Sequence, residues 1–143
     1  MPSTETRRVV ASKSTNEIVT IMAGKPRTPF SNEALVRVTA ISLNRGELGR
    51  AQRTADGTLQ IGWDFVGTVD TPAADGTGPV AGIRVVGFST RMEGWAELVA
   101  VPTSYIAPIP DGVSDAQAAT LPVAGLTALH SVDAATSLLG RHA

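Results

Sequence analysis

The chain has no cysteine among its 143 residues, and it is poor in histidine and in aromatic side chains. Without cysteine, neither a disulfide framework nor thiolate chemistry is available. The two histidines, His130 and His142, are twelve positions apart, so three or four nitrogen and sulfur ligands for zinc cannot be assembled. We therefore expect no metal site.

Other absences exclude further classes of protein. No apolar run approaches the roughly eighteen residues of a membrane span, and no signal peptide opens the chain. The sequence lacks the Gly-x-Ser-x-Gly nucleophile elbow of hydrolases. A net charge of −1 gives no reason to expect nucleic acid or a membrane surface as partner. These features predict a soluble, cytoplasmic protein.

Short β-favouring segments separated by turn residues fill the first 110 positions. Apolar pairs within 7–22 predict an antiparallel hairpin. Over 35–41 polar and apolar residues alternate, which predicts a strand with Val36, Val38 and Ala40 on one face. Further strands are expected at 65–71, 84–88, 95–101 and 105–107. Six or seven short strands favour a barrel or a sandwich.

Helical signals occur in two places, the first of them between strands. Asn44, followed three residues later by Glu47, has the spacing of an N-cap and its N3 partner, which predicts a short helix over 44–52. Of these two residues, Asn44 is the stronger candidate for the functional site. We expect Glu47 to have a structural role.

The second helical region follows residue 110. Ser114 and Gln117 have the spacing of a capping box, which opens a short helix. Pro122 then restarts the chain at a first helical turn. An apolar stripe continues from there, and Gly140 is suited to the position just after the end of this longer helix. The residues of the stripe are Leu126, Leu129, Val132 and Leu139.

Six motifs follow one another in a set order. They are Leu-Asn-x-x-Glu at 43–47, Asp-Phe-x-Gly at 64–67, Gly-Ile-Arg-Val-Val-Gly-Phe at 82–88, Gly-Trp-Ala-Glu at 94–97, Ile-Pro-Asp-Gly-Val-Ser at 109–114 and Leu-Pro-x-Ala-Gly-Leu-Thr-Ala at 121–128. In this order they resemble the medium-chain dehydrogenase/reductase superfamily. Its zinc enzymes have Cys where this chain has Asn44 and His where it has Trp63, and neither an amide nor an indole replaces those ligands. The resemblance is therefore to the zinc-free, quinone-oxidoreductase-like branch.

This resemblance implies a mainly β fold with C-terminal helices, of the α+β class. A GroES-like, partly open β-barrel would occupy 1–110. A short helix and a longer hinge helix would occupy 111–143 and lead toward a missing nucleotide-binding domain. No Gly-x-Gly-x-x-Gly turn occurs, so we expect the Rossmann domain to be absent and the chain to be the N-terminal portion of a longer reductase. The hinge helix would then expose its apolar stripe, which predicts homodimerisation or marginal stability.

The resemblance also implies a site. Asn44 would line the cleft as the catalytic residue and hold the substrate carbonyl or the nicotinamide; its alternative role is the helix cap. Trp63 would form a flat wall of the substrate pocket and Asp64 a hydrogen-bond anchor, or else Trp63 packs in the barrel and Asp64 caps a turn. Phe88 is a weaker substrate-binding candidate. Thr127 would approach the nicotinamide carboxamide, unless its hydroxyl only bonds back to a preceding carbonyl.

Taken together, the motifs imply the substrate-binding portion of a zinc-independent, NAD(P)H-dependent oxidoreductase that reduces a quinone or an α,β-unsaturated carbonyl. In such enzymes the cofactor carries the hydride and the protein orients the substrate. NADP(H) or NAD(H) is expected to bind the full-length protein but not this chain alone, which we expect to be inactive as a reductase. The alternative is a stand-alone truncated GroES-like module that acts as a binding protein or as a cofactor-free cyclase or isomerase.

Overall fold

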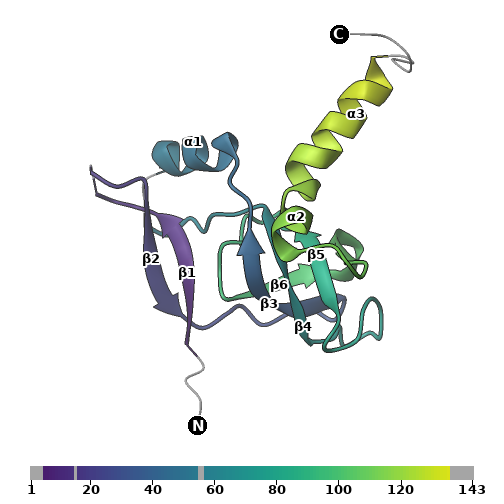
Figure 1. Cartoon of the computed structure of the whole chain (residues 1–143). Helices are drawn as coiled ribbons and strands as arrows, with labels where there is room; N and C mark the ends of the chain where they lie inside the picture. Colours follow the sequence, from purple (N-terminus) through teal and green to yellow (C-terminus); the bar gives the residue numbers. More distant parts are fainter. Residues whose placement is uncertain (1–4, 15, 55–56, 136–143) are drawn as a thin grey trace.

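A computed structural model describes residues 5–14, 16–54 and 57–135 (Figure 1). The element order is β1 (Thr6–Ala11), β2 (Val19–Gly24), β3 (Glu33–Ile41), α1 (Arg45–Thr54), β4 (Asp64–Thr71), β5 (Arg84–Phe88), β6 (Leu98–Pro102), η1 (Thr103–Tyr105), β7 (Ile106–Pro108), α2 (Asp115–Ala119), η2 (Leu121–Gly125) and α3 (Leu126–Ala134). Strands β1 and β2 form an antiparallel pair, which confirms the predicted hairpin. The other five form one antiparallel sheet in the order β6-β3-β4-β5-β7.

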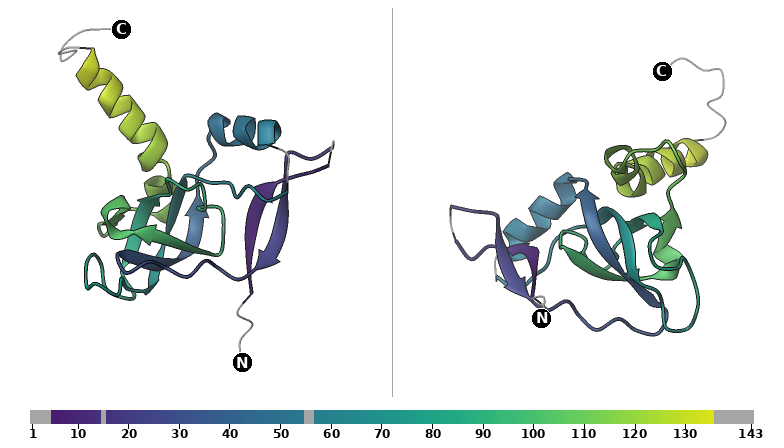
Figure 2. Two further views of the ribbon diagram at one scale, coloured as in Figure 1. Left: turned by 180° about the vertical axis from the view of Figure 1, so that it is seen from behind. Right: turned by 60° about the horizontal axis from the view of Figure 1, so that its bottom comes forward.

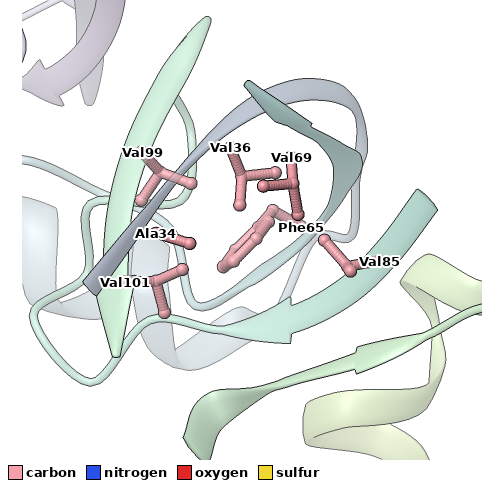
Figure 3. Packing of buried hydrophobic residues seen from close by; sticks show 7 residues of the cluster. All are labelled: Ala34, Val36, Phe65, Val69, Val85, Val99 and Val101. Carbon is pink, nitrogen blue, oxygen red and sulfur yellow. The ribbon is translucent and has the colours of Figure 1, made fainter. Parts of the chain in front are cut away.

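The five-stranded sheet curls around an apolar cluster centred on Phe65, which is fully buried (Figure 3). Along β3, Val36 is buried and Arg37 is exposed, as the alternation predicted. Gly87 lies against the Phe65 ring, where a Cβ atom would overlap it. Burying a phenylalanine of this kind contributes about 1.5–3 kcal/mol. The other members of the cluster are Ala34, Val36, Val69, Val85, Val99 and Val101.

A second apolar cluster joins the hairpin and α1 to the turn before β6. It contains Ala11, Ala51, Ile61, Met92 and Trp95. The Trp95 carbonyl accepts the Val9 N–H at 2.8 Å, and the Trp95 indole donates to the Ser42 carbonyl at 3.2 Å. Because Trp95 makes these irregular bonds, the first residues of the strand predicted over 95–101 do not join the regular ladder. Strand β6 therefore begins at Leu98.

The C-terminal helices are held to the sheet to very different degrees. Helix α2 begins with the predicted capping box of Ser114 and Gln117, and it buries Ala118 and Ala119 against the sheet. Helix α3 projects away from the sheets and buries none of its side chains (Figures 1 and 2). Its predicted stripe is exposed: Leu126, Leu129 and Val132 are each at least half accessible. Leu139 and Gly140 lie outside the described residues.

This arrangement confirms the predicted fold class: a mainly β, curled, partly open sheet followed by a short and a longer helix. A turn of π-helix, η2, separates the two helices where a simple restart at Pro122 was expected. The proposed division of the chain at residue 110 stays a prediction. Across the described residues, no helix is long and apolar enough to cross a membrane.

Candidate functional site

A hollow of about 1170 Å³ lies between the sheet and the helix that projects from it. The sheet side is formed by β5, η1 and β7, and the helix side by η2 and α3. Most of the lining is apolar. The hollow opens to solvent because the helix that forms one wall is itself exposed. Concave, mainly apolar surfaces with a few polar groups are the usual form of small-molecule sites.

Three of the five predicted site residues meet in this hollow. Trp63 contributes from just before β4, Phe88 from the end of β5, and Thr127 from the first turn of α3. The Thr127 hydroxyl makes no hydrogen bond within the described part of the chain. The alternative role predicted for Thr127, a hydroxyl bond to a preceding helix carbonyl, is therefore not formed. Ser131 makes such a bond, and its Oγ donates to the Thr127 carbonyl at 2.7 Å.

Asn44 and Asp64 lie beside the hollow and are not among its lining residues. Asp64 is fully buried. Its Oδ2 accepts a hydrogen bond from the Asn44 side-chain amide at 3.0 Å, and its Oδ1 accepts the Val123 backbone N–H at 3.1 Å. The carboxylate therefore presents no accessible surface to a substrate.

The predicted capping pattern at α1 is formed in one direction. The Asn44 backbone N–H donates to Glu47 Oε2 at 2.7 Å, as N3 residues accept in a capping box. The Asn44 side chain donates to Asp64 instead. The other Glu47 oxygen, Oε1, accepts the Trp63 backbone N–H at 2.6 Å.

Two carboxyl groups are thus buried next to the hollow. Burial raises the pKa of Glu47 above its ordinary value, against the opposing effect of the N–H groups of Trp63 and Asn44. Burial likewise raises the pKa of Asp64, while the hydrogen bonds from Asn44 and Val123 act to lower it. Desolvation prevails in both cases because, among the described residues, no cationic side chain faces either carboxyl to stabilise its charge.

Trp63 is held through both its ring and its backbone. Its ring lies against Gly46, where an added Cβ would come within 2.9 Å of the ring edge. Behind it, the Trp63 carbonyl accepts the Ser89 N–H at 2.7 Å. The indole therefore stands as a partition between the first turn of α1 and the hollow.

The residues at this place do not suit zinc. Across the described positions, no three side chains of the ligating kinds gather in a group that could hold a metal ion. The Asn44 amide is bonded to Asp64, and the Trp63 indole has no lone pair to offer a metal.

A comparison with known protein families identifies the domain that carries this site. Residues 31–111, more than half of the chain, match the alcohol dehydrogenase GroES-like domain. The chain belongs to this family. The match covers the five-stranded sheet and α1, and it confirms the GroES-like fold that the motifs predicted.

Solved structures with a similar fold include oxidoreductases. The human synaptic vesicle membrane protein VAT-1 homolog-like protein is 28% identical with a TM-score of 0.83, and the match covers 94% of this chain and 45% of that one. The quinone oxidoreductase from Coxiella burnetii is 24% identical with a TM-score of 0.81, and the match covers 92% of this chain and 45% of that one. The Escherichia coli quinone oxidoreductase complexed with NADPH is 21% identical with a TM-score of 0.80, and the match covers 92% of this chain and 41% of that one. The two quinone oxidoreductases, below 25% identity, show a shared fold alone, and the chain spans less than half the length of each structure.

The sequence did not single out two polar members of the lining, Tyr105 and His130. The Tyr105 ring lies against Phe88 with centroids 6.5 Å apart. His130 follows Thr127 by three residues on α3, so the two side chains lie on the same helix face. This i, i+3 spacing was the sequence signal that could have placed His130 in the hollow.

Proposed function

We propose that this GroES-like domain is the substrate-binding portion of a zinc-independent, NAD(P)H-dependent oxidoreductase that reduces a quinone or an α,β-unsaturated carbonyl. The observation that carries the proposal is the convergence of Trp63, Phe88 and Thr127 on one open apolar hollow. A flat, conjugated substrate suits such a site, because aromatic side chains provide flat contact surfaces without ionic groups.

The hollow also fits the reactive end of a nicotinamide cofactor. Aromatic rings at Trp63, Phe88 and Tyr105 suit a flat heterocycle, and the Thr127 hydroxyl is free to bond a carboxamide. The diphosphate of a nicotinamide cofactor is negatively charged and needs cationic or N–H donors. No lysine or arginine is among the described lining residues, so the hollow has no cationic side chain to bind it. When bound, the cofactor supplies a hydride.

The residues of this chain would orient the substrate and keep water away from it. An Asn side-chain amide has two N–H donors, and at Asn44 one of them is bonded to Asp64. We assign the second donor to the substrate carbonyl at the edge of the hollow. Thr127 would hold the nicotinamide from α3, and Trp63 and Phe88 would sandwich the conjugated ring.

Tryptophan fluorescence tests the substrate part of this proposal. The chain has two tryptophans, of which Trp63 lines the hollow and Trp95 is buried in the second cluster. Titration with 1,4-naphthoquinone should quench the emission saturably in the wild type and in a Trp95→Phe variant. In Trp63→Phe the saturable component should disappear. Equal saturable quenching in both variants would place the quinone elsewhere.

A titration with NADPH tests the cofactor part. Because the lining lacks cations, the isolated chain should show no enhancement of NADPH fluorescence at micromolar concentrations. Fusion to a nucleotide-binding half from a quinone oxidoreductase should then permit NADPH oxidation that depends on the quinone. Micromolar binding by the isolated chain would contradict the proposed division of labour.

A further inference from the structure

The helical segment that carries one wall of the hollow has no cap of its own. The first N–H groups of a helix have no partner within it and usually bond a nearby side chain. Thr120 stands at the N-cap position of η2, but it makes no capping bond, and its hydroxyl donates to the Gln117 carbonyl at 2.8 Å. Pro122 has no N–H to be satisfied.

The missing cap comes from a strand 59 residues earlier. Asp64 Oδ1 accepts the Val123 N–H at 3.1 Å in the first turn of η2. An acidic group at this end of a helix is also favoured by the helix dipole. The other oxygen of the same carboxyl holds the Asn44 amide, so one buried side chain connects β4, the start of α1 and the base of α3.

We propose that Asp64 is a positioning residue that caps the η2–α3 segment from β4 and thereby fixes the direction in which α3 leaves the sheet. The direction of α3 sets the distance between the two walls of the hollow. This consequence for ligands rests on the proposed function; the anchoring itself rests only on the contacts of Asp64.

Within α3 itself, no described side chain supplies an equivalent anchor. Helix α3 buries none of its side chains, and Gly125 at its N-cap has no side chain with which to cap it. Besides Asp64, the base of the helix is attached through the buried Pro122 and through the contacts of η2 with β4, β5 and α2. Helix α2 differs, because Ser114 caps it locally and Asp115 ties it to Arg84 on β5.

Hydrogen exchange at the Val123 amide, followed by NMR on the full chain, tests the cap. In the wild type this amide should exchange at least about tenfold more slowly than an unstructured reference, because its hydrogen bond to a buried side chain protects it. An unprotected Val123 amide would overturn the proposal without any variant. In Asp64→Ala the exchange should accelerate at least about tenfold.

Two further variants separate capping from a general loss of structure. Asp64→Asn keeps one oxygen for Val123, and the Asn44 amide can turn over to meet the new side chain. This conservative variant should restore Val123 protection to within about threefold of the wild type. Asp115→Ala loosens α2 without touching Val123 and should leave its exchange unchanged. Equal acceleration in Asp64→Ala and Asp115→Ala would mean that Asp64 acts only through stability.

The direction of α3 can be measured directly because the chain contains no cysteine. Nitroxide labels at Asp133→Cys on α3 and Thr90→Cys in the turn after β5 occupy exposed positions. Their distance distribution by pulsed electron resonance should be narrow in the wild type and in Asp115→Ala. It should be at least about twice as broad in Asp64→Ala if the lost bond had held α3 in place.

The two proposals can fail separately. An unchanged distance distribution in Asp64→Ala would refute the positioning role even if naphthoquinone binds. Absence of naphthoquinone binding to the wild type would refute the substrate assignment even if the distribution broadens.

Discussion

Glu47 is buried and accepts two backbone N–H groups, those of Asn44 and Trp63. Because burial raises its pKa, the folded chain holds the Glu47 proton more tightly than the unfolded chain does. The stabilisation from this proton is complete below the unfolded pKa and is lost as the pH rises through the folded pKa. Wild-type stability relative to Glu47→Gln should therefore fall as the pH rises above about 4, the ordinary range of a glutamate carboxyl.

Urea unfolding of both proteins across that range measures the difference. Asp115→Asn provides a control of the opposite sign, because hydrogen bonds from Thr39 and Arg84 lower the pKa of Asp115. The stabilisation from that group is present above its unfolded pKa and is lost as the pH falls. A Glu47→Gln profile parallel to the wild type would show that Glu47 does not titrate in this window.

The role of an individual residue was predictable where it depends only on local sequence spacing. Trp63, Phe88 and Thr127 line one hollow, and their contacts with substrate and cofactor stay predictions. Glu47 was recognised as a helix N3 residue, since that role depends only on the spacing from Asn44. Its second bond, to Trp63 sixteen positions later, depends on how the strands fold and has no local signal.

Helix α2 supplies a prediction about a single element. Ser114 Oγ accepts the Gln117 N–H at 3.2 Å, and Ser114→Ala removes this cap. The variant should lose about 1 kcal/mol of unfolding free energy, as N-cap deletions usually do. The Ser131 hydroxyl bonds only an exposed carbonyl within α3, so Ser131→Ala should change stability by less than about 0.5 kcal/mol. Urea denaturation distinguishes these values, and equal losses would contradict the role of the cap.

The strands followed from hydrophobic alternation, and α2 followed from its local capping box. The π-helical turn at η2 did not, because its stabilising contact comes from Asp64 on a distant strand. The start of β6 shifted for a similar reason: Trp95 bonds β1 and the 57–63 segment before the regular ladder begins. Elements with local signals are thus readable from sequence, while those completed by distant groups are not.

The molecule as a whole exposes an apolar face on α3. Leu129 is 54% and Val132 is 50% accessible, and the face continues along the helix. We expect the isolated chain to self-associate through this face as its concentration rises. Covering the exposed half of one such side chain contributes roughly 1 kcal/mol, so Leu129→Ser should weaken association several-fold. Sedimentation velocity over a range of concentrations provides the measurement.

A matched variant sharpens this test. Ile21 on β2 is also exposed, at 66%, but it lies on the hairpin. Ile21→Ser should leave the association constant unchanged. Equal weakening by Ile21→Ser and Leu129→Ser would indicate non-specific aggregation and contradict a defined contact through α3.

The contact between Gly46 and Trp63 makes the sizes of these two residues interdependent. A methyl group at position 46 would push the indole toward the hollow, and a smaller residue at 63 would leave a gap beneath α1. An evolutionary path that reshapes this end of the hollow therefore has to alter the two positions in concert, with the ring shrinking before the glycine grows.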